Sequence, residues 1–127
     1  VRGVVTVGDK AIETYSVHTE TIWLDPLRRN QQIDALAADA DKDYTYGLVG
    51  GDFNTATPGS IGALTKRFAE VGYERMSEGL GFTVIKSGIK FDIDHIFAKG
   101  MSFLDGGVYR ETEASDHFPV WVDLRLD

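Results

Sequence analysis

The chain contains no cysteine, and this absence excludes three kinds of chemistry at once. No disulfide can form, no thiolate can bind a metal ion, and no cysteine can act as a nucleophile. The cellular compartment stays open, because a protein without cysteine is compatible with either redox environment.

Basic residues are few: 13 lysines and arginines stand against 20 aspartates and glutamates, which gives a net charge of −7. This negative charge repels a polyanion over most of the surface, so we do not expect non-specific binding to DNA. The sequence leaves open a local basic patch. Its candidate members are Lys66, Arg67, Lys86 and Lys90.

Long apolar runs are also missing, and the start of the chain carries no signal-peptide pattern. We therefore expect a soluble chain without stable membrane insertion. The 127 residues, of which 43% are apolar, are enough for one domain with a substantial core. No repeat, low-complexity tract or linker divides residues 1–127, so we predict a single domain.

Two helices are predicted from apolar residues at helical spacing. The first covers residues 26–41, with Pro26 in its first turn and Asp25 as the N-cap. The second covers residues 61–71 and ends at Gly72. Strands are predicted over the remaining β-rich segments, which are 1–7, 11–19, 47–53, 82–85, 91–98, 101–109 and 119–126. The predicted class is α/β, with a mixed sheet covered by helices on at least one face.

The segment "GGDFNT" carries the first candidate site, at the end of the predicted strand 47–53. In an extended backbone Asp52 and Asn54 project to one side while Phe53 points into the core. A carboxylate beside an amide suits phosphoester hydrolysis, because one can take a proton from water and the other can donate a hydrogen bond to phosphoryl oxygens. Taken alone, the tetrapeptide "GDFN" favours an Asx-type turn at a strand end. Gly50 and Gly51 permit close approach of a backbone or a ligand.

Two further segments place polar groups at strand ends. "ASDHFPVWV" puts Asp116 and His117 before the last strand, where they could serve as a metal ligand and an acid or base, or as ordinary surface residues. In "FDIDHIFA", Asp94 needs a partner, and pairing with His117 would orient that imidazole. His95 points to the opposite face and is predicted to be structural. His18 closes the second strand and either contacts a phosphate or caps the strand.

Taken together, "GGDFNT", "DIDHIF" and "SDHFPV" in this order resemble the endonuclease/exonuclease/phosphatase superfamily of DNase I-like, metal-dependent phosphoesterases. A strand ending in histidine and the helical segment "RRNQQIDAL" precede them, so that the resemblance spans nearly the whole chain. It implies hydrolysis of a phosphoester with Mg²⁺ or Mn²⁺, which prefer oxygen ligands.

The resemblance also implies a role for each matching residue. Asp52 corresponds to the residue that activates or positions the attacking water, and Asn54 to the amide that orients the phosphate. Asp116 corresponds to a metal ligand. His117 corresponds to the histidine that contacts the scissile phosphate, with Asp94 as its orienting partner. The earlier phosphate-contacting histidine corresponds to His18.

Two family motifs are missing: an Asn-bearing first strand and a Gln-Glu pair whose glutamate binds metal. Glu13 and Glu20 are too close to His18 to supply that glutamate. The resemblance therefore implies a single partial domain over residues 1–127, the second half of a four-layer α/β sandwich. A half of this kind would leave an apolar sheet face open to water.

Several alternatives follow from the missing half. A homodimer would cover the open face with a second copy, whereas a fragment of a longer chain, consistent with a start at Val1, would bind metal and turn over poorly. A non-catalytic interaction module is a further alternative, against which the intact set of polar residues argues. A calcineurin-type phosphatase needs a "GNH" motif and more than the three histidines present. The substrate stays open among nucleic acid, phospholipid head group and soluble phosphate ester, and an aromatic loop near Trp23 and Tyr44 fits any of them.

Overall fold

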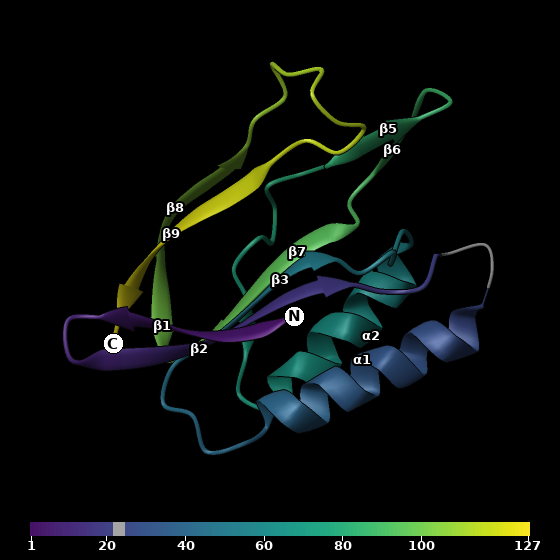
Figure 1. The fold of residues 1–127 in the computed structure, drawn as a ribbon. Helices are drawn as coiled ribbons and strands as arrows, with labels where there is room; N and C mark the ends of the chain where they lie inside the picture. Colours follow the sequence, from purple (N-terminus) through teal and green to yellow (C-terminus); the bar gives the residue numbers. More distant parts are fainter. Residues whose placement is uncertain (22–24) are drawn as a thin grey trace.

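The computed structural model describes residues 1–21 and 25–127, and a five-stranded mixed sheet with both helices on one face forms its centre (Figure 1). The pair β8–β9 lies on the other side of this sheet from the helices (Figure 1). The predicted class, α/β with a mixed sheet and helices on one face, is confirmed. The predicted aromatic loop includes Trp23, which lies outside the described residues.

The central sheet has the strand order β1-β2-β3-β7-β4. Only the pair β2–β3 among these described strands is parallel; the other neighbours are antiparallel. The parallel pair needs a crossover, which α1 provides. The strands are β1 Arg2–Val7, β2 Lys10–His18, β3 Gly47–Asp52, β4 Glu74–Arg75 and β7 Asp94–Lys99.

Both helices begin at a capped proline. Helix α1 covers Pro26–Ala40, and the Asp25 side chain accepts a hydrogen bond from the Arg28 backbone amide, as the sequence predicted. Helix α2 covers Pro58–Ala69 and begins three residues before the predicted start. The reason is a capping box, in which the side chains of Thr57 and Ser60 satisfy each other's backbone amides.

The main core lies between the sheet and the helices. Phe53, Phe68 and Phe97 are fully buried there, and the rings of Phe68 and Phe97 stack with their centroids 4.5 Å apart. Phe53 meets both of the other rings edge-on. Phe53 lies between Asp52 and Asn54 in the chain. Its packing in the core therefore holds the backbone that carries both of these candidate site residues.

The segment 91–98, predicted as one strand, is divided between two elements. Residues Ile89–Phe91 form β6, which pairs with β5 Val84–Lys86 in a hairpin, and β7 starts at Asp94. The hairpin turn lies at Ser87 and Gly88, which both have positive φ, of 50° and 76°, and it separates β5 from β6. Two residues in this conformation make the tight turn that joins antiparallel strands.

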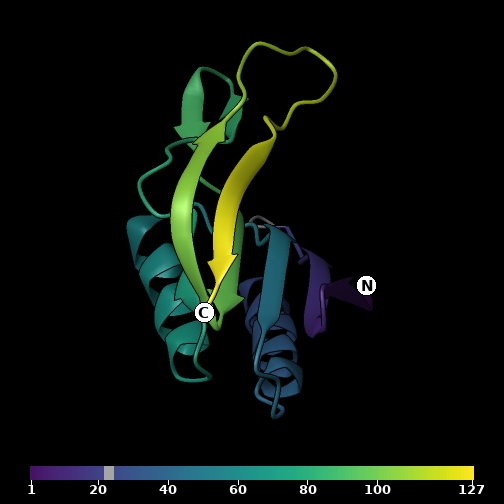
Figure 2. The same ribbon diagram turned by 90° about the vertical axis from the view of Figure 1, so that its left-hand side faces the viewer.

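Strands β8 Met101–Val108 and β9 Val120–Leu126 form a separate antiparallel sheet, and Figure 2 shows them side by side. The exposure of β9 alternates along the strand, with Val122 and Leu124 less exposed than Trp121, as the sequence predicted. An apolar groove of about 510 Å³ runs between β9 and the central sheet. The homodimer that would cover it stays a prediction, which light scattering can test. Within the described residues, neither helix has the length and apolarity needed to span a membrane.

Candidate functional site

Strand pairing places three polar side chains in one row across the central sheet. His18 lies opposite Asp52 in the parallel pair β2–β3, and Asp52 lies opposite Asp94 in the antiparallel pair β3–β7. Paired residues project from the same face of a sheet, so these three side chains gather at one edge. The distance from His18 Nε2 to Asp52 Oδ2 is 3.8 Å.

His117 reaches this row from the segment before β9. Its backbone forms an isolated bridge with Val84, and the next residue, Phe118, donates a backbone hydrogen bond to the Thr83 carbonyl at 2.7 Å. The imidazole Nδ1 donates to Asp94, with distances of 2.9 Å to Oδ2 and 3.0 Å to Oδ1. The structure therefore contains the predicted Asp94–His117 contact, and the opposite ring nitrogen lies 3.8 Å from Asp52 Oδ2.

The surrounding carboxylates shift the protonation of His117. Burial lowers the pKa of the imidazole, but the hydrogen bond and charge of Asp94, assisted by Asp52 and Asp116, outweigh burial and raise it above its usual value. Burial also raises the pKa of Asp52, against the hydrogen bond from the Asn54 backbone. The site thus favours a cationic imidazole held among carboxylates.

Asn54 departs from the extended conformation predicted for it. Its φ is +51°, and its backbone amide donates to Asp52 Oδ1 at 2.8 Å, which is the Asx-type turn named as the structural alternative. The Asn54 side-chain nitrogen donates one hydrogen bond to the Thr19 carbonyl at 2.9 Å, and Arg29 binds the Asn54 carbonyl. The side-chain nitrogen of Asn54 carries a second hydrogen, which this hydrogen bond does not use. Asn54 can therefore adopt the turn and still donate to a ligand.

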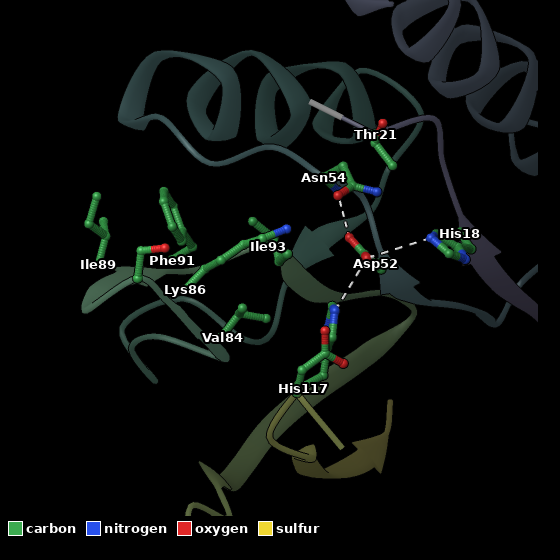
Figure 3. Close-up of a pocket in the computed structure, with 12 residues that line it drawn as sticks. His18, Thr21, Asp52, Asn54, Val84, Lys86, Ile89, Phe91, Ile93 and His117 are labelled. Carbon is green, nitrogen blue, oxygen red and sulfur yellow. Dashed lines mark hydrogen bonds and ion pairs between the residues drawn. The ribbon is translucent and has the colours of Figure 1, made fainter. Parts of the chain in front are cut away.

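A cleft of about 410 Å³ opens over these residues, and Figure 3 shows Asp52 between Asn54, His18 and His117. Asp116 lines the same cleft, so all but one of the predicted site residues line it; Asp94 supports it from behind His117. Among the described residues, Asp52, Asp94 and His117 offer ligand atoms within 4.8 Å of one another, a group that could hold a metal ion. Asp116 is not part of that group.

One wall of the cleft was not predicted from the sequence. It is made by the hairpin β5–β6, whose lining side chains are Val84, Lys86, Ile89 and Phe91. The alternation of these residues in "TVIKSGIKF" is a visible signal, but their position beside His117 depends on the tertiary bridge. The four basic residues do not form one patch around the cleft: Lys86 lines it, whereas Arg67 is on α2 and binds Asp34 at 3.0 Å.

Gly51 is required where β3 passes its neighbour. Its φ is +145°, and a Cβ atom there would lie 2.0 Å from the Val17 carbonyl oxygen. Gly50 has no such restriction, because the nearest atom to its Cβ position is 3.9 Å away. Close backbone approach was predicted for both residues, and the structure requires it of Gly51, one residue before Asp52.

His95 lies on the opposite face of β7 from Asp94, as predicted, and is fully buried. Its Nε2 forms a hydrogen bond with the Thr55 hydroxyl at 3.0 Å. Its Nδ1 lies 3.6 Å from Asp92, which accepts a hydrogen bond from Arg75 at 2.6 Å. This histidine anchors the loop after β3 to the core.

We expect His95 to make the fold acid-sensitive. Burial, assisted by the positive charge of Arg75, lowers the pKa of His95 to about 3. The unfolded chain therefore takes up a proton near pH ~6.5, while the folded chain does so only near pH 3. The contribution of His95 to the free energy of unfolding is complete above the pKa that His95 has in the unfolded chain. It declines on acidification through this window, by roughly 1.4 kcal/mol per pH unit.

Urea unfolding of the wild type and of His95→Gln between pH 4 and 7 measures this effect. The variant lacks the titrating group but keeps the carboxylates, so its free energy of unfolding should depend less steeply on pH. Equal slopes for the two proteins would show that the pKa of His95 is the same in the folded and unfolded chains.

A scan of protein-family models matches residues 1–117 to the Endonuclease/Exonuclease/phosphatase family. The chain belongs to this family. The site described above therefore lies in a family domain, and the resemblance drawn from the three sequence motifs is confirmed at the level of the family. A comparison with curated protein sequences gave no significant match.

Solved structures of several other proteins share the fold of this chain. An endonuclease/exonuclease/phosphatase from Beutenbergia cavernae has a TM-score of 0.80 and 22% identity, over 98% of this chain and 38% of that one. A family protein from Leptotrichia buccalis has a TM-score of 0.75 and 23% identity, over 98% and 52%. A Neisseria 3′ phosphatase bound to a product DNA hairpin has a TM-score of 0.68 and 20% identity, over 96% and 63%. The chain thus spans between about two fifths and two thirds of the structures it matches.

Proposed function

We propose that the cleft hydrolyses phosphoester bonds with the help of Mg²⁺ or Mn²⁺. The observation that carries this proposal is the convergence of His18, Asp52, Asn54 and His117 on one cleft, with Asp94 bound to His117. Family membership supports it, as do structural relatives described as a 3′ phosphatase bound to DNA and a mannosyl-6-phosphatase. A further relative, from D. rerio, is described in complex with a single-stranded DNA product.

The donor atoms of the cleft suit a hard divalent cation. Asp52 and Asp116 contribute carboxylate oxygens, the ligands that Mg²⁺ and Mn²⁺ prefer. Asp94 is less free to bind a metal, since both its oxygens contact His117 and one also accepts a hydrogen bond from Thr83. We assign the metal to Asp116, which leaves Asp52 to act on the attacking water. A bound cation would polarise the phosphoryl oxygens and stabilise the leaving oxygen.

The remaining side chains provide proton transfer and orientation. Ionised Asp52 accepts a proton from the attacking water, and the free amide hydrogen of Asn54 binds a phosphoryl oxygen. Protonated His117 donates from Nε2 to the charge that develops on the phosphoryl group, while Asp94 fixes its Nδ1 hydrogen. His18 is largely exposed at the cleft and provides a further contact to phosphate.

Metal binding and turnover test this function together. We expect Mg²⁺ and Mn²⁺ to bind in calorimetric titrations, and Asp116→Ala to weaken that binding by at least about tenfold, because loss of even an outer-shell partner of a metal ligand costs about 10- to 100-fold. Asp123→Ala is the matched control, because Asp123 is an exposed carboxylate on β9 outside the cleft.

Hydrolysis of bis(4-nitrophenyl) phosphate provides the second measurement. It should depend on the added cation and stop on addition of EDTA. Absence of metal binding, or equal binding by the wild type and Asp116→Ala, would overturn the assigned metal site. Hydrolysis that persisted in EDTA would contradict a metal-dependent reaction.

A further inference from the structure

The hairpin β5–β6 has two distinct faces. Cross-strand pairs place Val84 opposite Phe91 and Lys86 opposite Ile89, while Ile85 lies opposite Lys90. Side chains of a pair share a face and successive pairs alternate, so the first two pairs face one way and the third the other. The cleft is lined by every member of the first two pairs and by neither member of the third.

This hairpin is fixed beside the reacting groups. Val84 is bridged to His117, and the Thr83 backbone amide donates to the Phe91 carbonyl at 2.9 Å. Thr83 also donates through its hydroxyl to Asp94. The cleft face of the hairpin is therefore held in a defined position relative to the imidazole that we assign to the phosphate.

The cleft is polar at one end and apolar at the other. Figure 3 shows Asp52, Asn54 and the histidines on one side and the side chains of Ile89 and Phe91 on the other. Ile89 is 57% exposed, which leaves its side chain available to a ligand. A polyol placed against Ile89 and Phe91 would lose hydrogen bonds to water without finding partners on these two side chains, whereas an apolar ring would lose none.

The charge and the volume of the cleft further limit the class of ligand that it can bind. Among the described lining residues, Lys86 is the sole lysine or arginine, and Figure 3 shows it extending from the hairpin into the cleft. It supplies positive charge beside the apolar side chains of Val84, Ile89 and Phe91, and Ser87 in the turn of the hairpin also lines the cleft. The volume of about 410 Å³ is within the range of small-ligand sites and suits a phosphate with one ring.

We propose that the β5–β6 hairpin selects phosphoesters whose substituent is an aromatic ring, through apolar contact with Ile89 and Phe91 and a charge contact from Lys86. This inference rests on the proposed function, because it assumes that the phosphate lies at Asp52, Asn54 and His117. It disfavours inositol phosphates and sugar phosphates without an aromatic ring as substrates of this cleft.

Equilibrium binding of three compounds tests the inference without requiring turnover: inorganic phosphate, phenyl phosphate and glycerol 3-phosphate, each in the presence of Mg²⁺. We expect phenyl phosphate to bind about tenfold more tightly than glycerol 3-phosphate, the scale of a modest apolar contact. Ile89→Asn should abolish this preference and leave binding of inorganic phosphate unchanged. Ile85→Asn is the matched control, since Ile85 is an exposed isoleucine on the other face of the same hairpin.

Lys86→Met should weaken the binding of all three compounds, whereas Lys90→Met should weaken the binding of none. A nucleoside monophosphate that binds at least as tightly as phenyl phosphate would identify the ring as a nucleobase, and weaker binding would identify a simple aryl group; both results support the inference. Equal binding of the two esters, with inorganic phosphate bound, would overturn the inference alone. Failure of all three to bind would overturn the proposed function with it.

Discussion

Replacing His117 with alanine is expected to reduce phosphoester hydrolysis on the order of a thousandfold, the scale for loss of a group that stabilises transition-state charge. The imidazole is held by Asp94 at 2.9 Å, and its free nitrogen faces Asp52 across 3.8 Å. Removal of the ring deletes the donor that we assign to the phosphate. Initial rates with bis(4-nitrophenyl) phosphate and Mg²⁺, at a fixed concentration of folded protein, measure the effect.

Asp94→Asn separates orientation from direct contact. Without this carboxylate the pKa of His117 should fall, because the hydrogen bond and charge of Asp94 are the main factors that raise it against burial. The alkaline limb of the pH–rate profile should therefore move to lower pH, which a purely structural defect would not cause.

His18→Ala should have a smaller effect on the rate than His117→Ala, because the His18 side chain is largely exposed. A His117→Ala protein that kept a third of the wild-type rate would refute the assigned role.

Phe53→Ala is expected to destabilise the fold by about 3 to 5 kcal/mol, the usual cost of removing a buried phenyl group and leaving a cavity. Phe53 is fully buried and contacts Phe68 on α2 and Phe97 on β7 edge-to-face. A domain of ordinary stability has about 5 to 15 kcal/mol in total, so this loss could leave a large unfolded fraction. Urea unfolding followed by circular dichroism at pH 7 provides the measurement.

Phe103→Ala is the matched control for this truncation, because Phe103 is 46% exposed on β8. It should cost less than about 1 kcal/mol, since much of its surface already contacts water. Comparable losses for the two variants would mean that Phe53 is not part of a close-packed core. A stable Phe53→Ala protein would also remove the structural link between the core and the site residues on either side of it.

The candidate site was predictable from the sequence where residues follow the ends of apolar strands. The segment around Asp52 and the partnership of Asp94 with His117 could both be inferred, because strand alternation fixes which side chains share a face. The extended conformation considered for Asn54 was wrong, since a backbone hydrogen bond to Asp52 competes with extension of the strand, and the alternative Asx-type turn is the conformation found. The predicted strands 82–85 and 91–98 leave a break between them, but the pairing of β5 with β6 across Ser87 and Gly88 was not predicted.

By itself the sequence determined the fold class, the two helices, the family and the side chains at the strand ends. These properties depend on local periodicity, on capping residues and on short motifs, all of which are visible in neighbouring residues. The tertiary structure alone decided which strands from distant parts of the chain are neighbours. The register of β2, β3 and β7 aligns His18, Asp52 and Asp94, and the bridge between Val84 and His117 brings an apolar hairpin to the cleft. Such pairings join residues far apart in the chain, and their energies depend on packing that no single segment encodes.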